Sequence, residues 1–88
     1  MPSTITESTR SVPVVHECDV CVIGGSCTGV FAAVRAAQLG STVALIENSG
    51  FFGGVATAGL VSIWHSLFDT AGALRIIGGL TGEVIDRQ

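Results

Sequence analysis

The sequence contains no lysine, and charged residues of any kind make up only 12% of it. Its four arginines are scattered along the chain, and the formal net charge is −3. Nucleic-acid-binding domains and membrane-surface segments need clustered basic residues, so this distribution argues against both kinds of partner. A membrane-spanning helix needs roughly 18 consecutive apolar residues, and no run in this sequence approaches that length.

The N-terminal region lacks the apolar core of a secretory signal peptide. Residues 1–11 are polar and rich in serine and threonine, so we expect a flexible tail there. The three cysteines are an odd number without the spacing of a disulfide framework, which fits a reducing compartment. We therefore expect a cytoplasmic protein.

Nearly half of the 88 residues are apolar, at 48%. That proportion suits a piece of a larger core better than a free-standing small domain, which needs more polar cover. The apolar pattern of residues 76–88 predicts a terminal helix without a stop signal. We interpret residues 12–88 as the N-terminal part of a larger domain, truncated at residue 88.

Two apolar segments flank a helical one. We predict strands over residues 19–23 and 42–46, and a helix over residues 27–39 that stops at Gly40. The first strand is apolar on both faces, as expected of a buried parallel strand. In this chain alone, two strands and one covering helix would leave one sheet face and both strand edges unpaired. The fold class is therefore α/β, with a Rossmann-like βαβ unit that forms an incomplete parallel sheet. The predicted packing face of the helix consists of Val30, Ala33, Val34 and Ala37.

The signals weaken beyond the second strand. The sequence NSGFFGG predicts a turn-rich loop, and residues 55–60 fit either a short helix or an irregular segment. Residues 61–75 are ambiguous.

The turn between the first strand and the helix is rich in glycine. Against the pattern G-x-G-x-x-G, Gly24 and Gly29 fit the first and third positions, and Ser26 takes the second. Such a turn lets a diphosphate approach the backbone, and the helix N-terminus supplies free N–H donors and a partial positive charge. The Ser26 hydroxyl could donate to a phosphate oxygen, or the serine could displace the loop outward. A purely structural turn is the alternative.

An acid, Glu47, ends the second predicted strand, 18 residues after Gly29. A carboxylate at this place in a dinucleotide-binding unit accepts hydrogen bonds from two ribose hydroxyls. The same charge disfavours a 2′-phosphate, which argues against NADP. A solvated loop residue is the alternative interpretation.

The run from Asp19 to Leu60 resembles the FAD-dependent oxidoreductase family with a glutathione-reductase-like FAD-binding fold. The shared pattern is a strand, a glycine-rich turn, an alanine-rich helix, a strand that ends in glutamate, and a loop with a second Gly-Gly pair, here Gly53-Gly54. Residues 78–85 also look like the segment that follows in this family, so the resemblance covers residues 12–88. Ser26 stands where the family usually has a third glycine, and Cys27 replaces a proline or a small residue.

The resemblance implies that FAD is the cofactor. It implies that the turn lines the diphosphate, that Glu47 holds the adenosine ribose, and that Gly53-Gly54 approach the cofactor from the other side. The candidate cofactor-binding residues are Gly24, Gly25, Ser26, Cys27, Thr28, Gly29, Glu47, Asn48, Gly53, Gly54 and Thr57.

The function implied is that of an FAD-dependent oxidoreductase exchanging hydride or electrons with a small organic substrate. We expect the 88-residue chain alone to be inactive. An NAD-binding Rossmann segment of a dehydrogenase and a non-catalytic fragment are the alternatives. The sequence indicates no catalytic acid or base, substrate, electron acceptor or oligomeric state.

Several reactive side chains have simpler explanations. Cys18 and Cys21 form a C-x-x-C pattern, but on a strand they point to opposite faces, so we expect no metal site. Cys27 could have a redox role, although a bound diphosphate would cover it. His65, beside Trp64, could serve a flavin or a substrate, although a packed histidine is the commoner case.

Overall fold

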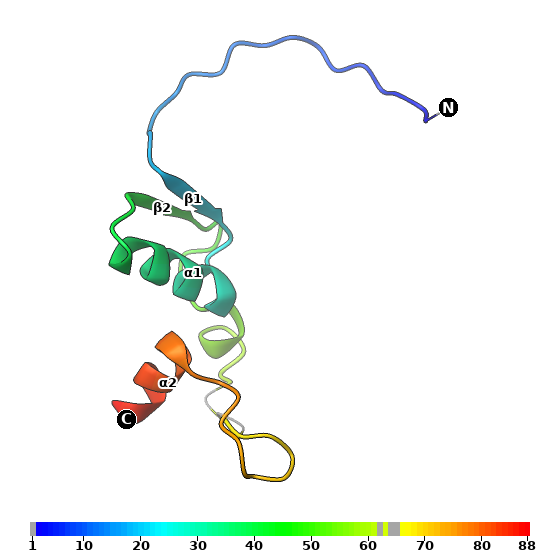
Figure 1. Ribbon diagram of the computed structural model, residues 1–88. Coiled ribbons are helices and arrows are strands. Elements are labelled where there is room, and N and C mark those ends of the chain that lie inside the picture. Colours follow the sequence, from blue (N-terminus) through cyan, green and yellow to red (C-terminus); the bar gives the residue numbers. More distant parts are fainter. Residues whose placement is uncertain (1, 62, 64–65) are drawn as a thin grey trace.

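The chain forms a βαβ unit followed by a loop-rich segment and a second helix (Figure 1). The computed structural model describes residues 2–61, 63 and 66–88. The elements are β1 (Val20–Ile23), α1 (Cys27–Gln38), β2 (Val43–Ile46), the 3₁₀ turn η1 (Gly54–Ala56) and α2 (Gly79–Asp86). Strands β1 and β2 pair in parallel, and α1 connects them. The predicted α/β class and the incomplete Rossmann-like unit are therefore confirmed.

The register of the two strands begins at a reciprocal contact between Asp19 and Thr42. The Asp19 N–H donates to the Thr42 hydroxyl at 2.9 Å, and the Thr42 N–H donates to the Asp19 carboxylate at 2.8 Å. The backbone hydrogen bond from Thr42, assisted by that residue's side chain, lowers the pKa of the Asp19 carboxyl. The contact lies directly before the pairing of Val20 with Val43 and fixes the two strands at their amino ends.

Helix α1 lies on the sheet through its smallest residues. Gly29 and Ala33 are buried and Val30 is half-buried. The predicted packing face is wrong at Val34 and Ala37, which are exposed. The physical reason is the width of the sheet: two strands offer a narrow surface, and only the central stripe of the helix meets it.

The helix ends at the predicted glycine. Gly40 has a φ of +97°, a left-handed conformation in which a Cβ would be strained. Its N–H donates to the Ala37 carbonyl at 3.0 Å, and the Ser41 N–H donates to the Ala36 carbonyl at 3.2 Å. These two bonds form a Schellman motif and satisfy carbonyls that the helix end would leave free.

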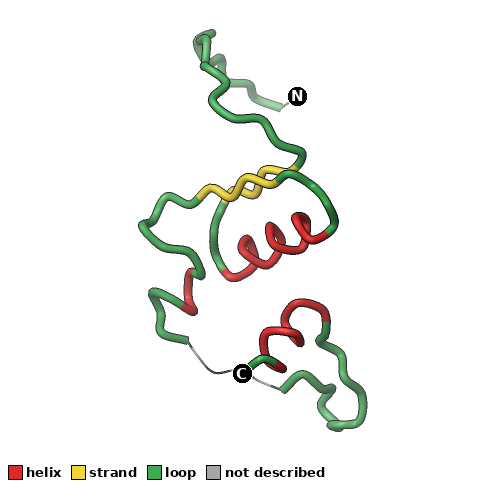
Figure 2. The backbone as a smooth tube through the Cα atoms, turned by 90° about the vertical axis from the view of Figure 1, so that its left-hand side faces the viewer, coloured by secondary structure: helices red, strands yellow, loops and turns green. Residues whose placement is uncertain are grey.

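The sheet is covered on one face only. Figure 2 shows α1 along one side of the two strands. On the other face Ile23 is 83% exposed and Ile46 is 53% exposed, and Cys21 is exposed beside them. This is the face that two strands and one covering helix were expected to leave open, and the described residues provide no second layer over it.

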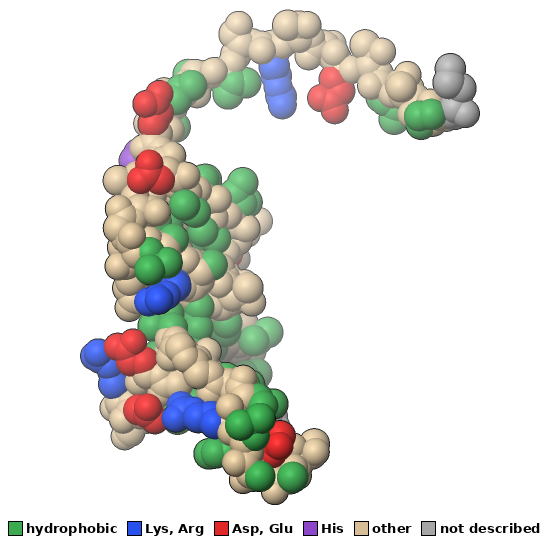
Figure 3. Space-filling model, viewed as in Figure 1, with side chains coloured by type: hydrophobic (Ala, Val, Ile, Leu, Met, Phe, Trp, Pro, Cys, Tyr) green, Lys and Arg blue, Asp and Glu red, His purple; other side chains and the backbone are tan. Residues whose placement is uncertain are grey.

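The remaining segments lie before and after the βαβ unit in the sequence. Residues 2–18 carry no helix or strand and extend away from the sheet (Figure 1). Helix α2 lies within the predicted range 76–88 but ends at Asp86, before the last residue. Charged side chains gather around α2, while the surface over α1 has few (Figure 3). Within the described ranges, no helix has the length and apolar character needed to cross a membrane.

Candidate functional site

The glycine-rich turn starts where the strands end. Gly24 has a φ of +105°, and its N–H donates to the Ile46 carbonyl at 2.8 Å. A Cβ on Gly29 would overlap the Gly24 carbonyl oxygen, so the first turn of α1 packs directly on the strand end. Gly24 and Gly29 are thus required by backbone conformation and close packing, the roles that the sequence pattern assigns to them.

Ser26 is the N-cap of α1. It has extended backbone angles, with φ −67° and ψ 179°, and its Oγ accepts a hydrogen bond from the Gly29 N–H at 3.4 Å. The hydroxyl accepts in this contact, so its own proton is left to donate outward. The serine therefore fits the turn as a helix cap and keeps a donor for a ligand.

The first turn of α1 carries an unpaired backbone donor. Among the described residues, the Thr28 N–H has no backbone acceptor, whereas the Cys27 N–H faces the Gly53 carbonyl across the bridge between Ser26 and Gly53. Helix N-termini leave such groups free, and their dipoles favour an anion. The Thr28 N–H and the Ser26 hydroxyl together form a pair of donors at the carboxyl end of the sheet.

Glu47 lies at the end of β2 and is tied to the turn. Its Oε1 accepts the Gly25 N–H at 2.9 Å, and its Oε2 accepts the Ser49 N–H at 2.8 Å. The backbone bond from Ser49, followed by the one from Gly25, lowers the pKa of the Glu47 carboxyl. The side chain is therefore a charged acceptor at neutral pH. Asn48, next to it, is exposed.

A cavity of 300 Å³ opens between the tips of the two strands. Its lining consists of Ile23, Gly24, Ile46, Glu47 and Asn48. It joins the glycine turn to the acid, so these two predicted features share one space.

The second glycine pair packs against the turn. The Gly53 N–H donates to the Gly25 carbonyl at 2.8 Å, and the Cys27 thiol donates to the Gly53 carbonyl at 3.0 Å. A Cβ on Gly54 would lie 3.3 Å from the Ser26 Cα. The pair is therefore in direct contact with the glycine-rich turn.

Thr57 has a local role in the same loop. Its hydroxyl donates to the Phe52 carbonyl, and a Cβ on Gly53 would overlap that hydroxyl. The structure thus brings Thr57 close to the second glycine pair, but its hydroxyl is directed into its own loop.

The sequence analysis did not identify Phe52 as part of this site. A Cβ on Gly25 would overlap the Phe52 ring and would lie 3.0 Å from the Glu47 Cβ, so the ring packs at the junction of turn and acid. A loop has no periodicity that could have indicated this contact. His65 and Trp64, considered above, lie outside the described residues.

The N-terminus of α1 also borders a larger cavity of 390 Å³. Residues from α1, from η1 with its N-cap, and from α2 line it, namely Cys27, Thr28, Val30, Phe31, Gly53, Ala56, Thr81 and Val84.

The three cysteines are free thiols. Across residues 2–61, 63 and 66–88, no group of three or more His, Cys, Asp or Glu side chains is arranged to hold a metal.

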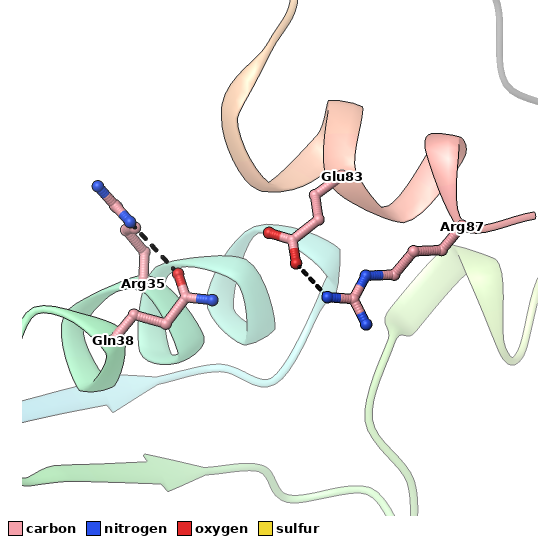
Figure 4. A network of polar contacts seen from close by, with 4 residues as sticks. All are labelled: Arg35, Gln38, Glu83 and Arg87. Carbon is pink, nitrogen blue, oxygen red and sulfur yellow. Dashed lines mark hydrogen bonds and ion pairs between the residues drawn. The ribbon is translucent and has the colours of Figure 1, made fainter.

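The polar side-chain contacts on the outer surfaces of α1 and α2 do not involve the candidate site residues. Figure 4 shows the Arg35 guanidinium donating to the Gln38 side chain at 3.4 Å on α1, and the Arg87–Glu83 ion pair at 2.7 Å at the end of α2. The latter is the single ion pair among the described residues. The Glu47 carboxylate is thus held by backbone amides rather than by a cation.

Sequence similarity links this chain to known proteins. The sequence profile of a family described as FAD dependent oxidoreductase matches residues 19–88. A dihydrolipoyl dehydrogenase from Trypanosoma brucei brucei is 44% identical over 45 residues, which is 51% of this chain and 9% of that protein. No solved structure matches the chain significantly.

Proposed function

The chain belongs to the FAD-dependent oxidoreductase family, and from this we propose that it binds the ADP part of FAD at the turn between β1 and α1. One observation carries the proposal: the Glu47 carboxylate accepts the Gly25 N–H at 2.9 Å. This bond joins the acid expected to hold the ribose to the turn expected to hold the diphosphate. Both halves of an ADP site are thus parts of one hydrogen-bonded unit.

The residues present fit an ADP group. Space is available at the turn, because a Cβ on Gly24 would meet no atom within 4 Å. The cavity of 300 Å³ leads from there to Glu47 and Asn48. Donors suited to a diphosphate are present in the Ser26 hydroxyl and in the Thr28 N–H at the N-terminus of α1.

Each group has a defined task in this proposal. The N-terminus of α1 binds the diphosphate through the Thr28 N–H and the helix dipole. The charged Glu47 carboxylate accepts the two hydroxyls of the adenosine ribose, and Asn48 lies at the outer rim of the same cavity. The low pKa of Glu47 keeps the carboxylate charged, which repels a 2′-phosphate and disfavours NADP.

The second glycine pair favours FAD over NAD. In a simple NAD-binding segment, Gly53-Gly54 would be incidental. Here the pair packs on Ser26 and Cys27, and the family match extends through it to residue 88. When bound, the flavin supplies hydride or electron exchange with an organic substrate. The residues of this chain bind and orient the ADP end, and the reaction belongs to the whole protein.

The proposal is tested by purifying the protein and recording its absorbance spectrum before and after added FAD. We expect a bound flavin spectrum, or quenching of flavin fluorescence that saturates on titration. A protein that retains NAD in preference to FAD would favour the dehydrogenase alternative. A protein that binds neither would leave the non-catalytic fragment as the explanation.

A further inference from the structure

The loop after β2 surrounds Gly25 on three sides. The Gly25 N–H donates to Glu47 at one end of the loop, and the Gly25 carbonyl accepts from the Gly53 N–H at the other. The third side is closed by the Phe52 ring, which a Cβ on Gly25 would overlap. Gly25 is buried, so its backbone groups are occupied by its own chain.

The position of Phe52 is itself fixed. Its carbonyl accepts the Thr57 hydroxyl, and the next residue, Gly53, is bonded to Gly25. The ring is 53% exposed, so burial alone does not account for its placement. A Cβ built on Gly25 would lie 2.5 Å from the Phe52 Cδ1 and 3.0 Å from the Glu47 Cβ, so the ring and the acid both lie close to the same side of Gly25.

We propose that Phe52 is a positioning residue that holds the Gly25 amide and the Glu47 carboxylate in the geometry needed to receive a ribose. The inference deepens the proposed function and rests on it for the ribose. The ring fills the space next to Gly25 and so restricts changes in the backbone conformation of that residue. It also covers one side of the Gly25–Glu47 hydrogen bond from water, which strengthens that bond.

If Phe52 holds the Gly25 amide in place, it should also affect the pKa of the Glu47 carboxyl in the protein without cofactor. The Gly25 bond is one of the two main causes that lower the pKa of the Glu47 carboxyl, the other being the Ser49 bond. A Gly25 amide released from its position would no longer favour the charged carboxylate. The pKa of Glu47 should then rise toward the ordinary value of a glutamate. No cation of the described residues pairs with Glu47, so the two amides dominate this response.

The test is an NMR titration of side-chain carboxyl signals in the full chain, without cofactor. In Phe52→Ala we expect the pKa of Glu47 to rise, while the lowered pKa of Asp19 stays unchanged as an internal measure of folding. Phe52→Tyr, which keeps the ring, should restore the wild-type value. Phe51→Ala, at a neighbouring exposed phenylalanine, should have no effect.

An unchanged pKa of Glu47 in Phe52→Ala would overturn the proposal, and so would an equal rise in Phe51→Ala. If Phe52→Ala no longer shows the lowered pKa of Asp19, Phe52→Val is judged by the same criterion, because it also lacks the ring.

A second measurement addresses the ligand. ADP affinity should fall about tenfold in Phe52→Ala, as expected for one weakened charge-assisted hydrogen bond. Absence of ADP binding in the wild type would refute the proposed function alone, since the titration reports on Phe52 independently.

Discussion

Glu47 and Gly25 are separated by 22 positions in the sequence and are joined by a 2.9 Å hydrogen bond from the amide to the carboxylate. The bond connects the end of β2 to the turn that follows β1. One carboxylate oxygen accepts from the turn, the other accepts the Ser49 N–H, and the side chain also lines the cavity between the strand tips. An acid at this place is therefore part of the turn's own structure as well as a candidate ribose ligand.

Replacing Glu47 should weaken ADP and FAD binding together. In Glu47→Ala the ribose loses a charged acceptor and the Gly25 N–H loses its partner, so we expect an affinity loss of at least about tenfold. Glu47→Gln keeps one acceptor oxygen and should lose less. Fluorescence titration measures both effects. Glu83→Gln, at an exposed glutamate on α2, is the matched control and should bind like the wild type. Undiminished binding in Glu47→Ala would disprove the ribose assignment.

The close contact of α1 with the turn can be tested by two glycine substitutions. A Cβ on Gly29 would overlap the Gly24 carbonyl oxygen, whereas one on Gly50 would meet no atom within 4 Å. Gly29→Ala should therefore destabilise the fold at or beyond the upper end of the roughly 1–3 kcal/mol typical of overpacking. Gly50→Ala should leave stability nearly unchanged. Thermal or urea unfolding gives the comparison, and equal midpoints for the two variants would contradict the packing described here.

The parts of the fold that depend on local chemistry could be predicted from the sequence. Gly40 stops α1 because its left-handed conformation follows from the glycine itself. The turn and Glu47 were predictable because their spacing encodes a strand, a helix and a second strand in order. Each depends on residues close in the sequence or on a spacing set by element lengths.

The parts that depend on tertiary surroundings could not be predicted. The packing face of α1 was wrong at Val34 and Ala37, because the width of the sheet decides how much of a helix is covered. The contact of Phe52 with Gly25 arises in a loop, where no periodic pattern reports which side chain turns inward.

Ser26 should contribute to both stability and binding. Its Oγ caps α1 through the Gly29 N–H, so Ser26→Ala should cost about 1 kcal/mol and lower the thermal midpoint by about 4–8 °C. Ser26→Gly should cost only a few tenths of a kcal/mol, because glycine is itself an acceptable N-cap.

The same pair of variants tests the phosphate contact. Ser26→Ala should bind FAD more weakly through loss of the hydroxyl donor, and Ser26→Gly should roughly preserve binding by restoring the usual geometry of the family. Ser11→Ala, in the exposed N-terminal segment, controls for loss of a serine elsewhere. Tighter binding by Ser26→Ala than by the wild type would mean that the serine is a steric obstacle.

Stability should decrease in acid through Asp19 and Glu47. Hydrogen bonds lower the pKa of both carboxyls in the folded chain, so the folded state binds fewer protons than the unfolded state near their ordinary pKa values of about 4. The stabilisation is fully present above that range and is lost as the pH falls through the lowered values. Unfolding midpoints measured from about pH 7 to pH 3 should therefore decline mainly below about pH 5.

Asp19→Asn separates the two contributions. It removes the charged acceptor of the Thr42 N–H, so the decline in acid should become shallower and the midpoint at neutral pH should fall. Asp86→Asn, at an exposed acid that ends α2, should leave the profile unchanged. A variant profile as steep as that of the wild type would show that Asp19 is not linked to folding.

Binding should depend on the ADP part of the ligand rather than on the flavin. All the contacts proposed here, from Ser26, Thr28 and Glu47, address the diphosphate and the adenosine ribose. The chain should therefore bind ADP about as tightly as FAD, and ADP should displace FAD in a fluorescence competition. FMN lacks the adenosine ribose and should compete poorly. A 2′-phosphorylated ADP should also bind more weakly, because its extra charge would meet the Glu47 carboxylate. Equal competition by FMN and ADP would place the ligand elsewhere on the chain. Flavin turnover by residues 1–88 alone would contradict the expectation that they serve only in binding.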